Sequence, residues 1–281
     1  MSVVTTPSPR TAATPHERRA APLVSVVVPC RDEGACIAPF LASLLAVDWP
    51  ADRLEVLVVD GMSGDGTRDA VAAVAARDAR VRLLDNPAHI TPVALNVGIR
   101  AARGEVVMRL DAHTEVPRDY VRRLVTALET SGAENVGAVL ETVPGGPGVM
   151  ARAIAAALAH PLAVGNSHFR TGTREPRWVD TVPFGCWHRA HFARVGLFDE
   201  ALVRNQDDEF NHRTLARGGK LLLLPDVRVR YVARDRLGKL ARMMWQYGRF
   251  KPLVARKVGQ VATVRQLVPA AFVAALVGGV A

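Results

Sequence analysis

Cysteine is scarce in this chain of 281 residues, which contains only Cys30, Cys36 and Cys186. Three scattered cysteines are too few for a disulfide framework or a zinc site, and they favour a reducing compartment. Residues 1–22 lack the apolar segment that directs secretion, so we expect no secretory signal there. Because these residues are rich in Thr, Pro, Ala and Arg and show no apolar periodicity, they predict a disordered N-terminal tail.

Acidic residues are scarce in one segment, and this gives the chain its net charge of +9. Residues 228–257 contain ten Lys or Arg and a single acid, Asp235, so the remainder of the chain is neutral. A basic segment beside an apolar C-terminal stretch favours contact with anionic lipid or phosphate over nucleic-acid binding. We therefore expect no nucleic-acid partner.

Charge is absent after Arg265. Residues 267–281 would form a helix about 22 Å long, shorter than a hydrocarbon core of about 30 Å. They are a partial span, an interfacial hairpin, the start of a span cut off by the chain's end, or a buried C-terminal helix. Before them, residues 237–250 predict an amphipathic helix whose apolar face carries Leu237, Leu240, Met244 and Tyr247.

Short apolar strands alternate with amphipathic helices in the first half of the chain. A β-branched run at residues 24–28 predicts a strand that Pro29 ends, and Thr91 is expected to cap a helix with Pro92 at its first position. Further strands are predicted at residues 55–59, 81–84 and 105–110. This alternation predicts an α/β fold with a mostly parallel sheet covered by helices on both faces.

Beyond residue 135, the regular alternation of predicted strands and helices ends. We expect the following elements there: a strand at residues 136–140, an Ala-rich helix at 149–165 broken near Pro161, a mobile polar loop at 165–177, a helix capped by Asn205 with Gly218 past its end, and two strands at 220–224 and 227–231.

Three polar motifs follow predicted strands, at the edge of the sheet where parallel sheets bind ligands: Pro29–Glu33, Asp60–Thr67 and Asp111–His113. Asp111 and His113 point the same way along an extended chain, so they can converge on one divalent ion beside a phosphate. Asp60 suits a ribose hydroxyl or a base N–H, and the glycines after it allow a close approach of backbone. Taken singly, each motif is also compatible with a solvated strand end or a Gly-rich turn.

Two nucleotide-binding signatures are missing. A Walker A loop needs Lys and then Ser or Thr after Gly66, where this chain has Thr67 and Arg68. No G-x-G-x-x-G follows the first strand, which argues against a dinucleotide-binding dehydrogenase.

Two further motifs lie in the second half. Q-D-D-E opens the helix after Asn205, and the helix N-terminus would keep Asp207 ionised as a carboxylate base. Q-Y-G-R-F carries Arg249, whose fixed charge suits a diphosphate. The simpler explanations are acids that favour a helix start, and an interfacial amphipathic helix.

In this order, the motifs V-V-P-C-R-D-E, V-V-D-G-M-S-G-D-G-T, L-D-A-H, N-Q-D-D-E-F-N-H-R and Q-Y-G-R-F resemble those of family 2 glycosyltransferases of the GT-A fold. The resemblance covers residues 23–250 and is strongest to membrane-associated bacterial enzymes of the succinoglycan type. It implies an inverting, hexosyltransferase-like enzyme at the cytoplasmic face of the cell membrane. Such an enzyme moves a sugar from a nucleotide-sugar donor to a hydroxyl of a lipid-linked saccharide acceptor in exopolysaccharide biosynthesis.

The resemblance also implies roles for single residues. Asp207, or else Asp208, would be the catalytic base, and Asp111 and His113 would bind Mn²⁺ or Mg²⁺. The donor would be bound by Pro29, Arg31, Glu33, Asp60, Asp111, Gln246 and Arg249. The acceptor side is expected to include His168, Arg170, Trp187 and His188.

Three positions depart from the family pattern. His113 replaces the second Asp of D-x-D, which leaves metal use intact but makes the metal's identity less certain. Gln206 replaces the acid before Asp207. Phe250 replaces the Trp of Q-x-x-R-W, which disfavours processive synthesis.

We expect a GT-A domain over residues 23–235, with a nucleotide-binding half at 23–130 and an acceptor half at 131–235. A basic amphipathic interface segment (236–265) and a hydrophobic membrane-associated segment (266–281) would follow. Two alternatives remain: a catalytically inactive membrane-bound partner with the same fold, and a sugar nucleotidyltransferase.

Overall fold

The computed structural model describes residues 20–165 and 167–259. The predicted tail up to residue 19 and the predicted hydrophobic segment at 266–281 lie outside these residues. Within the described ranges, no helix combines the length and the apolar character needed to cross a bilayer.

A single mixed sheet runs through both predicted halves of the chain, in the order β3-β2-β1-β4-β8-β6-β9-β5, with β7 paired to β9. The first four strands are parallel to one another, and β6 is parallel to β9, whereas β8 is antiparallel to β4 and β6. The strands are β1 (Val24–Cys30), β2 (Leu54–Asp60), β3 (Val81–Asp85), β4 (Val106–Arg109), β5 (Thr114–Glu115), β6 (Asn135–Val143), β7 (Arg177–Val179), β8 (Cys186–His188) and β9 (Leu221–Val232).

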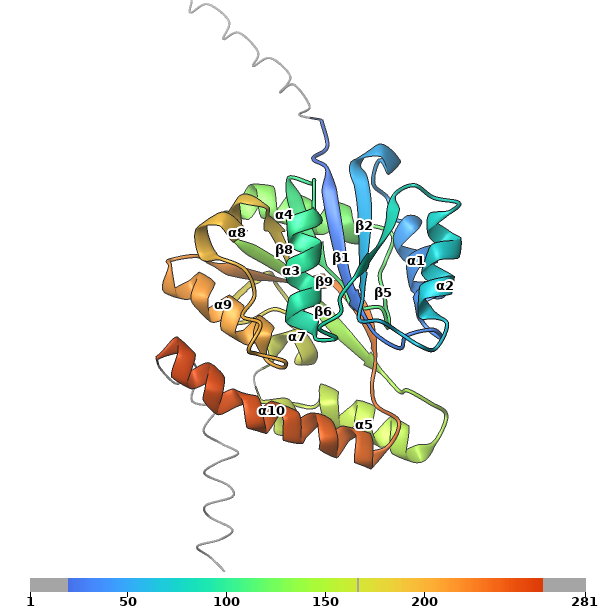
Figure 1. Ribbon diagram of the computed structural model, residues 1–281. Helices are drawn as coiled ribbons and strands as arrows, with labels where there is room; N and C mark the ends of the chain where they lie inside the picture. Colours follow the sequence, from blue (N-terminus) through green and yellow to red (C-terminus); the bar gives the residue numbers. More distant parts are fainter. Residues whose placement is uncertain (1–19, 166, 260–281) are drawn as a thin grey trace, which may run out of the picture.

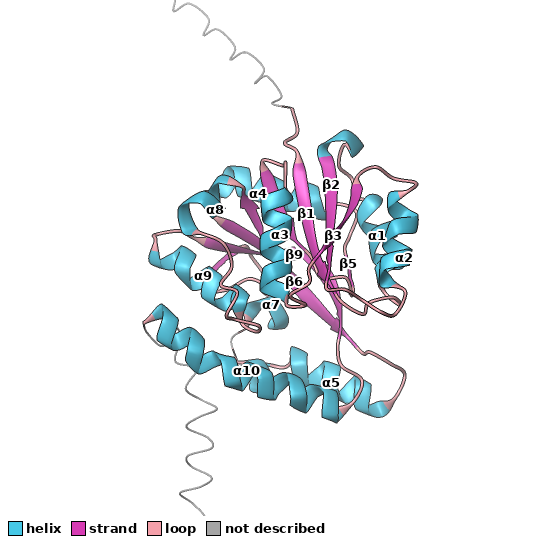
Figure 2. Ribbon diagram, viewed as in Figure 1, coloured by secondary structure: helices cyan, strands magenta, loops and turns pink. Residues whose placement is uncertain are grey.

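Helices cover both faces of this sheet (Figure 2). In β1, Val26 and Val28 face a core formed with α1 and α4, whereas Val27 faces a second core formed with α3 and α9. The alternation follows from the two-residue period of a strand. The helices are α1 (Ile37–Leu45), α2 (Thr67–Ala75), α3 (Thr91–Ala101), α4 (Tyr120–Ser131), α5 (Val149–Ala159), α6 (Pro161–Val164), α7 (His168–Thr171), α8 (Ala190–Val195), α9 (Gln206–Ala216) and α10 (Leu237–Val258), with a 3₁₀ turn at Ala51–Arg53.

Helices α5 and α10 lie side by side below the sheet, apart from its two main cores (Figure 1). A small cluster joins them, in which Ile154 and Leu158 of α5 contact Met243 of α10. Most of the remaining α10 surface is exposed. The amphipathic helix expected at residues 237–250 is therefore present and continues to Val258.

Two boundaries differ from the expectations in the first half. Pro29 does not end the first strand, because β1 continues to Cys30 and Pro29 pairs with Val59 of β2. Pairing with β4 stops at Val27, so the missing N–H of Pro29 removes no ladder hydrogen bond on that side. The residue that caps α3 is Ile90, and Thr91 is already helical.

Two expectations were wrong in the second half. The predicted pair of strands after Gly218 is one strand, β9, whose register against β6 shifts between Ala138 and Val139. The residues around Pro225 form this irregularity, which absorbs a proline that otherwise interrupts a strand. The predicted loop at residues 165–177 contains the short helix α7.

Candidate active site

Two loops at the carboxyl ends of β1 and β2 hold one another by hydrogen bonds. The Asp32 N–H donates to Ser63 Oγ at 2.8 Å, and the Gly64 N–H donates to Asp32 Oδ1 at 3.2 Å. The Glu33 N–H donates to Thr67 Oγ1 at 2.9 Å. The motifs that begin at Pro29 and at Asp60 therefore form one continuous edge of the site.

Glycine is required at Gly34 because the two loops approach closely there. A Cβ at this position would lie 2.8 Å from the carbonyl oxygen of Asp65. The Asp65 carboxylate accepts from the Gly34 N–H at 2.9 Å and from the Thr67 N–H at 3.1 Å. One carboxylate thus fixes both the loop crossing and the start of α2.

Asp60 is fully buried at the end of β2. It accepts from the Ser63 N–H at 2.9 Å and from Arg68 Nη1 at 2.9 Å, and Arg68 also reaches Asp85 at 2.8 Å. Burial raises the pKa of Asp60, but the hydrogen bonds from Ser63 and Arg68 outweigh it and lower the pKa below its ordinary value. Asp60 is therefore an ionised anchor of this loop, and its contact with a nucleotide stays a prediction.

Pro29 and Arg31 border the same loops. Pro29 is half-buried in β1, and the exposed Arg31 side chain lies against Gly61, where a Cβ would come within 3.2 Å of it. The Arg31 Nε lies 3.7 Å from Asp32 Oδ2, so its guanidinium remains at the surface. The Arg31 side chain is 54% exposed, so it is accessible to solvent at the edge of the sheet.

His113 meets Glu33 across the site. Its Nδ1 lies 3.0 Å from Glu33 Oε1, and its ring contacts Tyr231 edge-on with centroids 5.9 Å apart. Burial lowers the pKa of His113, whereas the hydrogen bond to Glu33 and the charge of Asp111 raise it, and the net direction is upward. In the neutral tautomer that carries its proton on Nδ1, this nitrogen donates to Glu33 and the Nε2 lone pair is available to a metal, as in carboxylate–histidine–metal arrangements.

The donor atoms of Asp111 and His113 fit a divalent ion such as Mn²⁺, which accepts both carboxylate oxygen and imidazole nitrogen. Arg109 bonds chiefly to Asp111 Oδ1, at 3.0 Å, and lies 3.4 Å from Oδ2, which is less engaged. In the described part of the chain, no three His, Cys, Asp or Glu side chains are grouped to hold a metal. An ion held by Asp111 and His113 would therefore have coordination positions left for other ligands.

Helix α9 presents Asp207 and Asp208 in its first turn. It is anchored one turn later by Asn211, which accepts from Asn135 Nδ2 at 2.9 Å and donates to the Val182 carbonyl at 3.1 Å. These buried bonds tie the helix to the sheet and fix the direction of its first turn. The polar sequence Q-D-D-E predicted the helix start, but not this anchor.

Asp207 and Asp208 have different surroundings. Lys251 of α10 donates to Asp208 Oδ2, and Thr181 Oγ1 lies 3.4 Å from Oδ1. Asp207 accepts no hydrogen bond from another side chain among the described residues, and 39% of its side chain is exposed. Asp207 is therefore the more accessible of the two carboxylates, since the Asp208 side chain is only 17% exposed.

The pKa of Asp207 is raised above its ordinary value, opposite to the lowering expected from the helix N-terminus. Burial raises it most, the charge of Arg109 lowers it, and the charge of Asp208 raises it again. The side chain keeps an opening to solvent although most of the volume around it is protein. A carboxylate with a raised pKa binds a proton more strongly, as a general base must.

Arg109 joins the metal-binding pair to the base. This guanidinium is only 6% exposed, and it donates to Asp111 Oδ1 through Nη2 at 3.0 Å while its Nη1 lies 3.9 Å from Asp207 Oδ2. Nη1 is buried and has no hydrogen-bond partner among the residues that the structure describes. Arg109 was not among the candidate residues, because an arginine two positions before a D-x-H motif carries no recognisable signal.

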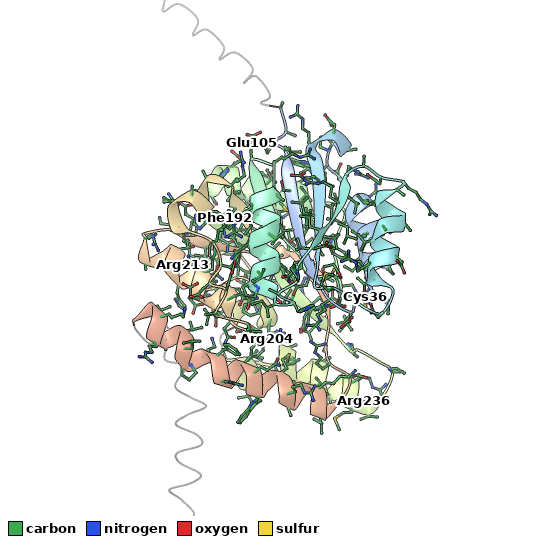
Figure 3. All side chains as sticks on the ribbon, in the orientation of Figure 1. Cys36, Glu105, Phe192, Arg204, Arg213 and Arg236 are labelled. Atoms are coloured by element: carbon green, nitrogen blue, oxygen red, sulfur yellow. The ribbon has the colours of Figure 1, made fainter. Side chains whose placement is uncertain are left out.

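Helix α10 docks on the start of α9. Arg204 Nε donates to Gln246 Oε1 at 3.0 Å, and Asn205 Nδ2 donates to the Tyr247 carbonyl at 3.2 Å. Figure 3 labels Arg204 above the middle of α10. Gln246 is thus brought to the site, whereas Arg249 is exposed on α10 and forms no hydrogen bond or ion pair with another candidate residue of the described chain.

The acceptor-side residues are only partly placed as expected. The Arg170 guanidinium lies 5.3 Å from the centroid of the Tyr231 ring, beside His113. Trp187 was wrongly assigned, because it is 2% exposed and lies in a core cluster with Phe192, Phe198 and Phe210. His188 pairs with Val106 at the start of β4, the end opposite Asp111, so it does not reach the site either.

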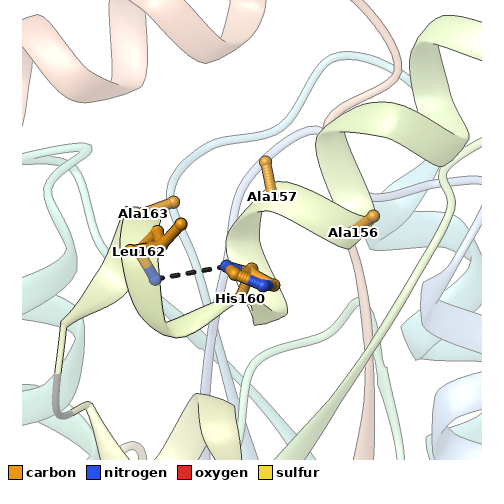
Figure 4. Close-up of a pocket in the computed structure, with 5 residues that line it drawn as sticks. All are labelled: Ala156, Ala157, His160, Leu162 and Ala163. Carbon is orange, nitrogen blue, oxygen red and sulfur yellow. Dashed lines mark hydrogen bonds between the residues drawn. The ribbon is translucent and has the colours of Figure 1, made fainter.

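A hollow of about 400 Å³ lies between α5 and α6, lined by Ala156, Ala157, His160, Leu162 and Ala163 (Figure 4). His160 Nδ1 accepts from the Leu162 N–H at 3.2 Å and thereby caps α6. The lining is mostly methyl groups and includes no candidate site residue, so this hollow is separate from the chemistry.

Comparison with known proteins gives consistent matches. A family model described as Glycosyl transferase family 2 matches residues 25–200. Succinoglycan biosynthesis protein ExoA of Rhizobium meliloti (strain 1021) is 30% identical over 253 residues, which cover 88% of this chain and 74% of that protein. The dolichyl N-acetyl-alpha-D-glucosaminyl phosphate 3-beta-D-2,3-diacetamido-2,3-dideoxy-beta-D-glucuronosyltransferase of Methanococcus voltae is 24% identical over 83% of this chain and 74% of that protein.

Solved structures confirm the α/β fold. The mannosyltransferase PcManGT from Pyrobaculum calidifontis, in complex with GDP-Man and Mn²⁺, superposes with a TM-score of 0.62 at 23% identity, over 84% of this chain and 69% of that one. GalNAc-T7 with UDP, GalNAc and Mn²⁺ gives a TM-score of 0.61 at 19% identity, over 76% of this chain and 44% of that one.

Proposed function

The chain belongs to glycosyl transferase family 2, and from this premise we propose that it is an inverting enzyme that transfers a sugar from a nucleotide-diphosphate donor to a hydroxyl of a lipid-linked saccharide. One observation carries the proposal: Arg109 links Asp111 on one side of the site to Asp207 on the other. We assign Asp111 to the donor diphosphate and Asp207 to the acceptor hydroxyl, so the two reacting groups would lie on either side of Arg109.

Asp207 removes the proton from the acceptor hydroxyl as its oxygen bonds to the sugar C1. The bond between C1 and the diphosphate oxygen breaks, and the nucleoside diphosphate leaves with both bonding electrons. Attack from the face opposite the leaving group inverts the configuration at C1. Asp111 and His113 would hold a divalent ion, which offsets the charge that develops on the leaving diphosphate.

The buried guanidinium of Arg109 fixes the position of Asp111 relative to Asp207. It holds the Asp111 carboxylate, and its charge opposes protonation of Asp207. The 39% exposure of the Asp207 side chain leaves that carboxylate open to the acceptor. Pro29, Arg31, Glu33 and Asp60 form the opposite edge, which is assigned to the nucleotide.

We further propose that α10 lies on the cytoplasmic face of the cell membrane. Trp245 is 74% exposed, Met244 43% and Leu237 55%. Arg242 and Arg249 are exposed on the same helix. Exposed tryptophan flanked by arginines is typical of helices that lie in the interface of a bilayer.

A transfer assay tests the enzymatic proposal. Purified protein with Mn²⁺ and a panel of nucleotide sugars should release nucleoside diphosphate, slowly with water and faster with a lipid-linked acceptor. Release of pyrophosphate from a nucleoside triphosphate and a sugar phosphate would instead identify a nucleotidyltransferase. No turnover of any donor, with donor binding retained, would identify an inactive partner protein.

A further inference from the structure

A second pocket of about 550 Å³ adjoins the candidate active site on the side of α10. This volume falls in the usual range of small-molecule sites, about 300–1,000 Å³. Five of its eight lining residues are basic and none is acidic. The lining consists of Arg204, Arg234, Arg236, Gly238, Lys239, Arg242, Met243 and Gln246.

Few negative charges oppose these basic side chains. Lys239 Nζ lies 2.8 Å from Asp235 Oδ1, and Arg236 Nε lies 3.6 Å from Asp235 Oδ2, so two cations share one carboxylate. Arg234 and Arg242 form no ion pair within the described residues. These positive charges repel one another, and binding of an anion would relieve that repulsion.

The N-terminus of α10 adds to the positive potential. Its N-cap residue, Arg236, makes no side-chain hydrogen bond to the N–H groups of the first turn. The first N–H groups of a helix are free to bind an anion, and the helix dipole favours negative charge there. Cationic side chains and helix N-terminus thus point to the same class of ligand.

The pocket is continuous with the site rather than remote from it. Arg204 and Gln246 both line the pocket, and Arg204 Nε donates a hydrogen bond to Gln246 Oε1. Arg204 lies two residues before α9 begins at Gln206. Arg234 follows three residues after Tyr231, whose ring contacts His113 edge-on. The pocket therefore borders the start of α9, whose first turn carries Asp207.

We propose that this pocket binds the phosphate or diphosphate group that joins the acceptor saccharide to its lipid. The assignment rests on the proposed function, because it requires a lipid-linked acceptor. The donor diphosphate is assigned to Asp111 and His113. Of the pocket lining, Gln246 alone was expected to contact the donor, so the five basic side chains are left for the second substrate. Trp245 and Met244 of the same helix are exposed apolar side chains, which would be available to an apolar lipid chain.

Equilibrium binding of a fluorescent farnesyl diphosphate tests the inference without donor or metal. The variant Arg234→Gln/Arg242→Gln should bind this probe about tenfold more weakly or worse, since a charge-assisted hydrogen bond contributes about 1.5–3 kcal/mol. The matched control Arg152→Gln/Arg256→Gln removes two exposed arginines of α5 and α10 outside the pocket, and it should stay within about threefold of the parent. Inorganic pyrophosphate should compete with the probe.

Equal probe affinity in the parent and the pocket variant, with both proteins unfolding at the same temperature, would overturn the proposal. Vesicles of phosphatidylcholine and phosphatidylglycerol distinguish the two sources of phosphate. If the pocket variant loses only vesicle binding and keeps farnesyl diphosphate, the pocket serves lipid headgroups and the proposal is wrong. Failure of the proposed function has a different signature, because the parent would then turn over no nucleotide sugar.

Discussion

Arg109 Nη1 lies 3.9 Å from Asp207 Oδ2, and the opposite side of the same buried guanidinium donates to Asp111. A residue of β4 therefore connects two carboxylates that belong to distant parts of the chain. Because the guanidinium is planar and always charged, it can hold Asp111 by hydrogen bonds and present its charge to Asp207 at the same time. The effect of each carboxylate on turnover should depend on this arginine.

Arg109→Lys tests this connection. Lysine keeps the charge but presents one ammonium group, which cannot hold Asp111 and face Asp207 together. We expect kcat for transfer to fall about tenfold or more, since charge-assisted bidentate contacts are lost. Arg103→Lys, which alters an arginine bonded to Glu55 away from the site, is the control and should keep normal turnover. An equal loss in both variants would mean that Arg109 has no special role.

Asp207→Asn should reduce kcat by about 10²–10⁴ while donor affinity is kept, because only proton removal is lost. Asp208→Asn should cost less, since Asp208 is engaged by Lys251 and Thr181. Steady-state kinetics and donor binding measured on the same preparations provide the comparison. A larger loss of kcat in the Asp208 variant would identify Asp208, and not Asp207, as the catalytic base.

The pH profile gives an independent test of the base. Protonation blocks a general base, so turnover should fall with decreasing pH through the raised pKa of Asp207. The charge of Asp208 contributes to that raised pKa, so the acidic limb of kcat should move to lower pH in Asp208→Asn. A limb that stays in place would show that another group controls it.

Metal binding should depend on Glu33 as well as on its direct ligands. Glu33→Gln weakens the hydrogen bond that orients His113, and loss of such a partner typically costs about 10–100-fold in metal affinity. Titration of thermal stability with Mn²⁺ measures the change, and excess chelator should abolish the metal effect in every variant. Glu141→Gln, an exposed acid on β6, should bind Mn²⁺ like the parent.

Glu55 should make the free energy of unfolding depend on pH in the acidic range. It is 2% exposed and accepts from Ser25 Oγ at 2.6 Å and from the Arg103 N–H at 2.7 Å. Burial raises its pKa, but these bonds outweigh it and lower the pKa below the ordinary 4.5. Its contribution is therefore complete above about pH 4.5 and is lost as the pH falls through the lowered folded value.

Glu55→Gln should lower the free energy of unfolding by about 1–3 kcal/mol at pH 7, and the difference from the parent should shrink in acid. Urea unfolding at several pH values measures it. The exposed Glu175→Gln serves as the control, and a constant difference at all pH values would contradict the ionised role of Glu55.

Membrane contact should depend on the exposed apolar side chains of α10. Met244→Ser/Trp245→Ser should weaken binding to vesicles about tenfold or more, because burial of a large apolar side chain contributes about 1.5–3 kcal/mol. Trp178→Ser/Val203→Ser removes exposed apolar side chains from other elements and should bind like the parent. Vesicle sedimentation measures both, and equal binding by all proteins would exclude α10 as the contact.

Local patterns predicted the elements and the edge of the sheet at which the site lies. The β-branched runs, the glycine-rich turn after Asp60 and the two-residue spacing of Asp111 and His113 are all short-range features. Their exact limits were less predictable: β1 continues through Pro29, because the strand pairing that its missing N–H would disturb has already ended. β9 continues past Pro225 because an irregularity in the sheet absorbs it.

The sequence by itself determined the α/β alternation, the strand-end carboxylates and the basic character of the segment that contains α10, because these depend on neighbours a few residues apart. Only the tertiary structure decided that Arg109 lies between Asp111 and Asp207, that Lys251 engages Asp208, and that Trp187 is core. Those relationships depend on how helices pack across the sheet. Side chains far apart in the chain meet there only after burial has fixed the position of every element.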